Sequence, residues 1–376
     1  MVAVEPSIIM DNLSYMGRAV DLAKKAIGSV SPNPPVGAVL VKNRKIVGEG
    51  WTQPPGQNHA EIEAIMMAGR EASGAVLYTT LEPCNYVGRT GACTEAIINA
   101  GISEVIVAVI DSNPVVNGSG ISRLSQVGIV VSTDDTVEEA KRLTEAYTKY
   151  VTTSKPFVTA KFAMSLDGKI ATKTGSSRWI TGNKARSYSH QLRAMSDAVM
   201  VGVNTIISDD SRLTARSGDG AVLSNSPLRI VVDSQGRISK NSALFSEPGS
   251  VLIATALDSN AANSLSLGLN VSVISIPGSD GRVDLPALLN YLGDNEITSL
   301  LVEGGGELLG SLFDLQLVDK VCAFIAPSII GGGSKAVSAV GGDGIAQISD
   351  ASILENSKIV KLGDDFLFNA YCRDTK

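Results

Sequence analysis

The stretches HAEIEAI (residues 59–65) and LEPCNYVGRTGAC (residues 81–93) contain the residues that decide how this sequence is interpreted. They hold one of the two histidines, two of the four cysteines, and a glutamate two places after the histidine. Zinc prefers histidine nitrogen and cysteine thiolate as ligands, and catalytic zinc sites use three protein ligands with an open fourth position. His59, Cys84 and Cys93 supply three such ligands, so these stretches predict an open zinc site.

Glu61 is the candidate proton carrier beside this metal. Two positions along a regular helix rotate a side chain by about 200°, but in the first turn of a helix Glu61 can point into the same cleft as His59. Zinc lowers the pKa of bound water to about 7, and a nearby carboxylate can pass the released proton to a leaving amine. H-x-E followed later by Pro83-Cys84 resembles the pattern of zinc deaminases.

A closed, purely structural zinc site is the alternative. Such a site needs a fourth cysteine or histidine close by, and the remaining candidates, His190, Cys322 and Cys372, all lie far along the chain. For the two cysteines we expect a packing role. The open site is therefore the favoured interpretation.

The segments around these residues alternate between strand and helix patterns. VGAVLV (36–41) and IVGEG (46–50) flank a polar KNRK turn, which predicts a β-hairpin. The other predicted elements are helices over 16–28, 59–69, 94–100 and about 136–149, and strands over 75–81, 105–110 and about 128–131. This alternation is typical of an α/β sandwich, and we expect a first domain over residues 1–150.

A break at residues 151–156 (VTTSKP) precedes a second α/β pattern, because Pro156 and small polar residues end the helix. The predicted elements are an alternating segment over 157–171, a helix over 183–196, and strands over 198–203, 228–233, 251–256 and 299–304. Residues 301–314 (LVEGGGELLGSLFD) join a strand to a helix through three glycines. We expect a second domain over residues 151–376.

Composition narrows the function classes. With 44% hydrophobic and 19% charged residues, the 376-residue chain matches compact globular domains rather than a disordered chain. A net charge of −6 disfavours a dedicated nucleic-acid binder. We expect no membrane span, because no apolar run approaches the required length, and no signal peptide. Four cysteines do not suggest a disulfide framework, so we expect a cytoplasmic protein.

Eight residues separate Cys84 from Cys93, where a generic zinc deaminase has C-x-x-C. This enlarged loop, with Gly-Arg-Thr inside it, resembles the deaminase half of the bifunctional riboflavin-biosynthesis deaminase–reductases. SPNPPVGAVLV (31–41) and DSNPVVNGSGI (111–121) resemble that family as well. The resemblance implies a cytidine-deaminase-like α/β/α sandwich in which Asn33 binds the pyrimidine and Arg89 and Thr90 hold the ribose phosphate.

Three features depart from the family pattern. The family commonly has histidine where this chain has Tyr86 and often where it has Thr52, and a proline pair where it has Gly91-Ala92. No metal ligand and no proton carrier is lost. We expect a looser loop before Cys93, and an active reductase fused to an impaired or retargeted deaminase is the alternative function.

The second half resembles the reductase half of the same family, which has a dihydrofolate-reductase-like α/β fold. The resemblance lies in residues 160–171, 176–182, 201–216, 228–234, 301–314 and 326–333. It implies a substrate pocket formed by Ser177, Arg193, Asp209, Leu213, Arg216 and Glu303. It implies an NADPH site formed by Lys161, Trp179, Thr181, Thr205, Asp209, Gly304, Gly305 and Gly306. Among these, Lys161, Arg193 and Arg216 are cations suited to a sugar phosphate.

Some of these residues have simpler interpretations. The glycine run from Gly304 to Gly306 can seat a cofactor phosphate at a helix start, or can be only a tight bend. Trp179 can contact the cofactor or serve as a buried anchor. In Asp209-Asp210-Ser211 the proline that the family commonly has is missing.

The resemblance implies a two-reaction enzyme. The first reaction is zinc-dependent hydrolytic deamination of 2,5-diamino-6-ribosylamino-4(3H)-pyrimidinone 5′-phosphate. The second is NADPH-dependent reduction of the product's ribosyl group to a ribityl chain. The family also implies a homo-oligomer, a dimer or a tetramer. A nucleic-acid-editing deaminase is disfavoured by the acidic charge and by the reductase motifs.

Overall fold

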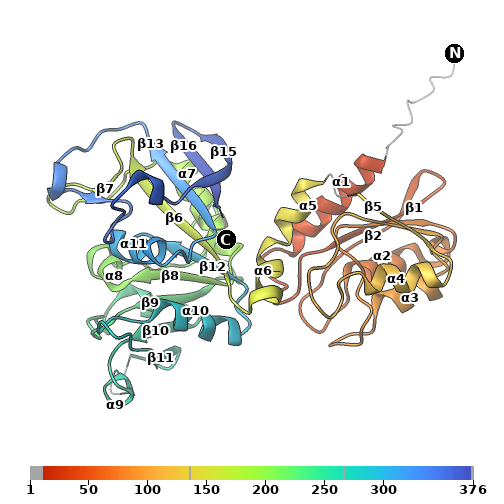
Figure 1. The fold of residues 1–376 in the computed structure, drawn as a ribbon, viewed down its shortest axis with the longest axis horizontal. Coiled ribbons are helices and arrows are strands. Elements are labelled where there is room, and N and C mark those ends of the chain that lie inside the picture. Colours follow the sequence, from red (N-terminus) through yellow and green to blue (C-terminus); the bar gives the residue numbers. More distant parts are fainter. Residues whose placement is uncertain (1–11, 135–136, 264, 266, 374–376) are drawn as a thin grey trace. The chain divides into compact units, whose positions relative to one another are not determined.

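The computed structural model describes residues 12–134, 137–263, 265 and 267–373, and the chain forms two compact units that divide between Ser154 and Lys155 (Figure 1). The expected boundary at 150–151 falls inside a helix, α6 (Glu145–Thr153). That helix ends where Ser154 takes a left-handed conformation (φ 57°) and its N–H donates to the Tyr150 carbonyl. The two units are described separately below.

The first unit is built on a five-stranded sheet with the order β2-β1-β3-β4-β5. Its strands are β1 (Gly37–Lys42), β2 (Lys45–Trp51), β3 (Val76–Thr79), β4 (Glu104–Val107) and β5 (Val130–Thr133). Strands β1 and β2 form the predicted antiparallel hairpin, whereas β3, β4 and β5 run parallel.

Helices cover both faces of this sheet. They are α1 (Asn12–Ala23), α2 (Ala60–Ala68), α3 (Cys93–Asn99), α4 (Ser119–Gln126), α5 (Glu138–Leu143) and α6. Alternate strand residues point to opposite faces. Leu77 and Val105 therefore pack with α2, α3 and α4, while Tyr78 and Ile106 pack with α1 and α5. This is the expected α/β/α sandwich.

Glycines in β2 let helix α2 lie unusually close to the sheet. A Cβ atom on Gly48 or Gly50 would lie 2.2 Å from the carbonyl oxygens of Ala64 and Ala60, respectively. No side chain fits in that space, so only glycine permits this approach. Because α2 begins directly after His59, the close packing also places the start of the helix against the sheet.

The second unit is built on a nine-stranded sheet with the order β11-β10-β9-β8-β12-β6-β13-β16-β15. The strands are β6 (Phe157–Ser165), β8 (Ala198–Gly202), β9 (Leu228–Val232), β10 (Val251–Thr255), β11 (Val271–Ser275), β12 (Ser299–Glu303), β13 (Lys320–Ala326), β15 (Leu354–Leu362) and β16 (Asp365–Cys372). The strands from β11 to β13 are parallel, and β16 and β15 add antiparallel pairs. A small separate sheet pairs β7 (Lys169–Ala171) with β14 (Val337–Ser338).

Helices again cover both faces. They are α7 (Asn183–Ala194), α8 (Val203–Asp209), α9 (Ser259–Asn263), α10 (Leu285–Asp294) and α11 (Gly306–Asp314). The leucines of α10 and α11 form one core with Met200 and Val302, and α8 packs with Val199 and Val201 on the other face. Cys322 is buried beside α7, as expected for a packing residue.

Most expected elements are present, with some differences. The helix expected over 136–149 is two helices, α5 and α6, which meet at Thr144, and its first residue lies outside the described residues. Helices α4, α8, α9 and α10 and strands β11, β13, β15 and β16 did not emerge as separate predicted elements, whereas the helix expected after the three glycines is α11. Within the described ranges, no helix combines the length and the apolar character needed to cross a membrane.

Candidate active sites

His59, Cys84 and Cys93 come together in the first unit. His59 directly precedes α2, Cys84 lies in the loop after β3, and Cys93 is the first residue of α3. Their ligand atoms all lie within 4.8 Å of one another, and His59 Nδ1 is 3.7 Å from Cys84 Sγ and 3.3 Å from Cys93 Sγ. One nitrogen and two sulfurs in such a cluster are a donor set that zinc prefers. No other group of this kind occurs among the residues that the structure describes.

The two sulfurs differ in their environments. The pKa of the Cys84 thiol falls to about 4, because it accepts a hydrogen bond from Cys93 and is close to His59. The Cys93 backbone N–H also donates to Cys84 Sγ at 3.4 Å. Cys84 therefore lies at the start of α3 in space, although in the sequence no helix begins directly after it. The pKa of Cys93 is raised by its bond to Cys84 and by burial. The surroundings of Cys84 thus favour its thiolate form.

Glu61 lies in the first turn of α2, as the sequence predicts, and its side chain is buried beside the ligand cluster. Its Oε2 accepts from Cys93 Sγ at 3.5 Å. Burial raises the pKa of this carboxyl above its ordinary value. A carboxyl whose pKa is raised holds a proton more readily than a free one, which suits a group that takes up and passes on a proton.

The three residues expected to bind substrate in this unit lie in loops. Thr90 Oγ1 is 3.4 Å from His59 Nε2, the ring nitrogen that faces away from the sulfurs. A metal-binding histidine commonly uses its second nitrogen for an orienting hydrogen bond, and Thr90 is placed to accept it. Arg89 is exposed, and half-buried Asn33 donates its backbone N–H to Val30.

Glu82 is a site residue that sequence reasoning missed. Its buried carboxylate accepts four backbone N–H groups, from Asp111 (3.2 Å), Gly118 (2.9 Å), Gly120 (2.9 Å) and Ile121 (3.2 Å). This anchors the loop after β4 and the start of α4 to the strand-end loop that carries Cys84. A glutamate next to Pro83-Cys84 was visible in the sequence, but backbone partners leave no sequence pattern.

Replacing Glu82 with Gln should destabilise the first unit. The amide has one acceptor oxygen for four backbone donors, and a buried donor left unsatisfied, such as the N–H of Asp111 or Gly120, costs roughly 1–3 kcal/mol. We expect the free energy of unfolding to fall by about 2–4 kcal/mol, measured by denaturant unfolding. Glu95→Gln removes an exposed carboxylate that pairs with Arg123 and should change stability little. Equal losses in both variants would contradict the anchoring role of Glu82.

The structure shows the contacts of two residues that depart from the family pattern, Thr52 and Tyr86. Thr52 is buried, and its hydroxyl bonds both the N–H (3.0 Å) and the carbonyl (3.5 Å) of Val36, so it joins the ends of the β-hairpin strands. Tyr86 is 41% exposed, and its ring lies against Gly88, where a Cβ atom would be only 2.8 Å from it. Burial and the nearby Cys84 raise the pKa of Tyr86.

A cavity of about 1360 Å³ opens in the second unit at the carboxyl ends of parallel strands, the usual ligand position in such sheets. All thirteen residues proposed for this half line it: Lys161, Ser177, Trp179, Thr181, Arg193, Thr205, Asp209, Leu213, Arg216, Glu303, Gly304, Gly305 and Gly306. The structure therefore brings into one cavity residues that are spread over 146 positions between Lys161 and Gly306.

Glu303 is the centre of a buried ion cluster in this cavity. At the end of β12, its carboxylate accepts from Arg193 Nη2 on α7 at 2.9 Å and from Lys161 Nζ on β6 at 3.3 Å. Burial alone would raise the pKa of Glu303, but the two cations outweigh it and hold the pKa at about 2. Arg193 also donates to the Thr214 carbonyl at 3.0 Å. Arg193 and Lys161 thus share Glu303 as their partner.

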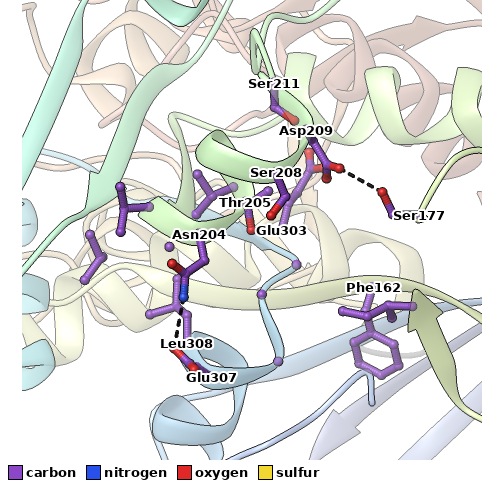
Figure 2. A pocket seen from close by; sticks show the side chains of 18 of the residues that line it. Phe162, Ser177, Asn204, Thr205, Ser208, Asp209, Ser211, Glu303, Glu307 and Leu308 are labelled. Carbon is purple, nitrogen blue, oxygen red and sulfur yellow. Dashed lines mark hydrogen bonds between the residues drawn. The ribbon is translucent and has the colours of Figure 1, made fainter. Parts of the chain in front are cut away.

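Figure 2 shows the part of the cavity around Asp209, at the end of α8. Ser177 Oγ donates to Asp209 Oδ1 at 2.8 Å, and Asn204 Nδ2 donates to Glu307 Oε2 at 3.3 Å. The next residue, Asp210, has a left-handed backbone (φ 45°), and its Oδ1 accepts a hydrogen bond from the Ala243 N–H at 2.8 Å. Asp210 is the position that a proline commonly follows in the family.

The glycines after β12 are required by the backbone. Gly304 and Gly305 have φ values of 62° and 78°, a region that favours glycine. A Cβ atom on Gly306 would lie 2.7 Å from the Ser338 carbonyl oxygen. This tight bend opens α11 on the cavity wall, so the run is both a bend and a helix start at the ligand site.

Trp179 is 70% exposed on the cavity wall, so the alternative that it is a buried anchor is wrong.

The cavity wall as a whole is cationic. Eight lysine and arginine side chains line it against five acidic ones, in a chain whose net charge is −6. A concave surface with excess positive charge attracts anionic ligands.

Comparison with known proteins identifies both units. Residues 10–109 match the cytidine and deoxycytidylate deaminase zinc-binding region, and residues 156–368 match the RibD C-terminal domain. The riboflavin biosynthesis protein RibD of Aquifex aeolicus is 40% identical over 94% of this chain and 96% of its own length. The RibD protein of Escherichia coli is 36% identical over 95% and 98%, respectively.

Solved structures agree. The RibD protein of Acinetobacter baumannii superposes with a TM-score of 0.84 at 32% identity, covering 96% of this chain and 98% of the other. A Thermotoga maritima protein described as a diaminohydroxyphosphoribosylaminopyrimidine deaminase/5-amino-6-(5-phosphoribosylamino)uracil reductase gives 0.83 at 34%, with the same coverage. These matches favour two active domains over a reductase joined to an impaired deaminase. The chain belongs to the RibD family of bifunctional riboflavin-biosynthesis enzymes, with a zinc-binding deaminase domain and a reductase domain related to NADPH-dependent reductases.

Proposed function

We propose that the first unit hydrolyses the exocyclic amine of 2,5-diamino-6-ribosylamino-4(3H)-pyrimidinone 5′-phosphate and that the second unit reduces the product's ribosyl group to a ribityl chain. The observation that carries this proposal is that one chain holds two sites of different chemistry. One is a His-Cys-Cys cluster with a buried carboxyl beside it, and the other is a large cation-lined cavity with a buried Glu303 centre. The names of the RibD relatives support the pathway.

In the deaminase we propose that His59, Cys84 and Cys93 would hold zinc, which would supply a bound water with a pKa near 7. Glu61 would act as the proton carrier between water and the leaving amine, a role supported by its raised pKa and its place beside Cys93. Asn33 binds the pyrimidine, and Arg89 and Thr90 bind the phosphate, with Thr90 also within reach of His59.

In the reductase we propose that NADPH supplies the hydride and that the chain binds and orients the two reactants. Glu303 fixes Lys161 and Arg193, and Ser177, Asp209, Leu213 and Arg216 complete the substrate side. Gly304, Gly305 and Gly306 seat the cofactor phosphates at the start of α11, and Trp179, Thr181 and Thr205 line the cofactor side. Orientation of the two reactants supplies much of the acceleration in such reactions.

We also propose that the protein is a homo-oligomer, a dimer or a tetramer, in the cytoplasm. An exposed edge strand supports the homo-oligomer. Strand β15 lies at the end of the nine-stranded sheet, and Ile359 on this strand is 68% exposed. None of the four cysteines forms a disulfide, which supports a reducing compartment and thus the cytoplasm. Light scattering of the purified protein measures the oligomeric state.

A paired assay on one purified sample tests the two reactions, with ammonia release measured from the diamino substrate and NADPH oxidation measured on the deaminated product. Removing zinc with a chelator should abolish ammonia release and leave NADPH oxidation within about twofold, because the metal ligands all lie in the first unit. Metal analysis before and after chelation, and recovery on adding zinc back, complete the test.

Two results would contradict the proposal. Ammonia release that survives complete removal of zinc would exclude the zinc mechanism. Absence of ammonia release from zinc-loaded protein, with NADPH oxidation intact, would show that Tyr86, Thr52 and Gly91-Ala92 have cost the deaminase its substrate or its rate.

A further inference from the structure

A short segment of the reductase cavity wall, residues 177–182, is held at both ends and carries an exposed indole between them. At one end Ser177 Oγ donates to Asp209 Oδ1 at 2.8 Å, and at the other the Gly182 N–H donates to Asp365 Oδ2 at 2.7 Å. Trp179, between these two anchors, is 70% exposed although it belongs to the lining of the cavity. A large apolar ring so exposed at a ligand site is available for contact with a ligand.

Arg186, in the first turns of α7, packs against this indole. Its guanidinium carbon lies 4.4 Å from the Trp179 ring centroid. Nη1 donates to the Thr181 carbonyl at 2.6 Å, and Nη2 donates to Asn183 Oδ1. The guanidinium is therefore fixed by two hydrogen bonds while it contacts the ring, a combination for which the planar fork of arginine is well suited.

Arg178 is the other cation near the ring, but its contact is weaker. Its guanidinium carbon is 5.8 Å from the Trp179 centroid, close to the outer limit for a cation–π interaction. Its Nη2 donates instead to the backbone carbonyl of Asp209. Arg186 is thus the residue that supports the indole from the helix, and Arg178 belongs to the anchor of the segment.

We propose that Arg186 is a positioning residue that presents Trp179 as a stacking surface for a flat heteroaromatic ring bound in this cavity. The proposal rests on the proposed reductase function, whose two ligands each carry such a ring, the nicotinamide of NADPH and the pyrimidine. A ring held in place before the ligand arrives saves the cost of ordering it on binding. Aromatic rings then gain from offset stacking beyond the area they bury.

Loss of the support should weaken binding more than it slows chemistry. For Arg186→Gln we expect the KM of the stacked ligand to rise about two- to tenfold, the range given by ordering one side chain. The kcat should change by less than about twofold, because Arg186 touches no reacting group. Arg186→Lys keeps the charge near the ring without the two-point hydrogen bonding, so its KM should lie between those of the parent and the glutamine variant.

The chain offers a direct reporter, because it has only two tryptophans. Trp51 lies in β2 of the deaminase unit, so a Trp51→Phe parent leaves Trp179 as the sole indole. Its emission is measured on titration with NADPH alone and with the deaminated pyrimidine phosphate alone. We expect quenching by the ligand whose ring stacks on it, which identifies that ring. Acrylamide quenching without ligand measures how exposed the indole is, and it should increase in Arg186→Gln.

Lys184→Gln is the matched control, since Lys184 is an exposed cation in the first turn of the same helix. It should behave as the parent. Equal acrylamide quenching and equal ligand response in parent and Arg186→Gln would overturn the proposal. So would a parent that oxidises NADPH while its Trp179 emission responds to neither ligand. A parent that oxidises no NADPH would instead overturn the reductase function, and acrylamide quenching would still decide whether Arg186 supports the indole.

Discussion

Replacing Glu61 with Gln should leave zinc bound and lower the rate of ammonia release by roughly 10²- to 10⁴-fold, the usual contribution of a general acid–base group. Glutamine has nearly the same shape, but it can neither take a proton from water nor give one to the amine. The three ligand side chains are untouched, and Glu61 lies beside Cys93 rather than among the ligands. The measurements are ammonia release under saturating substrate and zinc content by metal analysis.

Glu63→Gln is the matched control for this experiment. Glu63 lies on the same helix and accepts a hydrogen bond from Asn58 at 2.8 Å, away from the ligand cluster. It should retain both zinc and ammonia release. If Glu61→Gln lost zinc, or kept more than about a tenth of the parent's rate, the carboxyl would not be the proton carrier proposed for it.

Replacing Glu303 with Gln should damage the reductase in both stability and rate. Removing one partner of a buried ion cluster leaves Arg193 and Lys161 without their counter-charge, which typically costs roughly 3–5 kcal/mol. NADPH oxidation should fall by about 100-fold or more, because misplaced orienting groups cost about that much. Ammonia release should be unchanged, since the zinc ligands lie in the other unit.

The pH dependence of unfolding provides a second readout for Glu303. The pKa of this carboxyl is about 2 in the folded protein, below its ordinary 4.5. Its contribution to stability is therefore present above about pH 4.5 and is lost as the pH falls towards 2. Glu303→Gln should flatten the stability profile in that window. Glu355→Gln, which removes the partner of Arg373 in a solvent-exposed pair, should keep the parent's profile and activity. A Glu303 variant with the parent's profile would contradict the ion cluster.

The zinc cluster could be predicted from the sequence because metal chemistry restricts the choice of residues. Few side chains bind zinc, the chain has only two histidines and four cysteines, and a glutamate two residues after His59 has a clear use beside a metal. The hairpin and the strands next to these residues were also predictable, because a short apolar run bounded by turn residues is local information, and β1, β3 and β4 are such runs, buried almost throughout. The glycines of β2 then allow α2, which begins directly after His59, to pack closely on the sheet.

The parts that could not be predicted depend on contacts between distant segments. Glu82 binds backbone N–H groups some thirty to forty residues away, and a backbone donor carries no sequence signal. The pairing of Lys161 with Glu303 depends on β6 and β12 being neighbours in the sheet, which only the strand order decides. Strand β15 escaped prediction because most of its side chains are exposed, which hides the alternation of a half-buried strand.

The separation of site residues along the chain has a consequence for synthesis of the protein on the ribosome. His59 and Cys93 lie 34 residues apart, and the deaminase unit ends at Ser154, so its metal ligands can assemble while the rest of the chain is still being made. Lys161 can pair with Glu303 only after a further 142 residues have been synthesised. The sheet that contains both residues is complete only when β13 and β16 have emerged. During translation the deaminase can therefore capture its metal first, and Lys161 remains without its counter-charge until the last third of the reductase unit has left the exit tunnel.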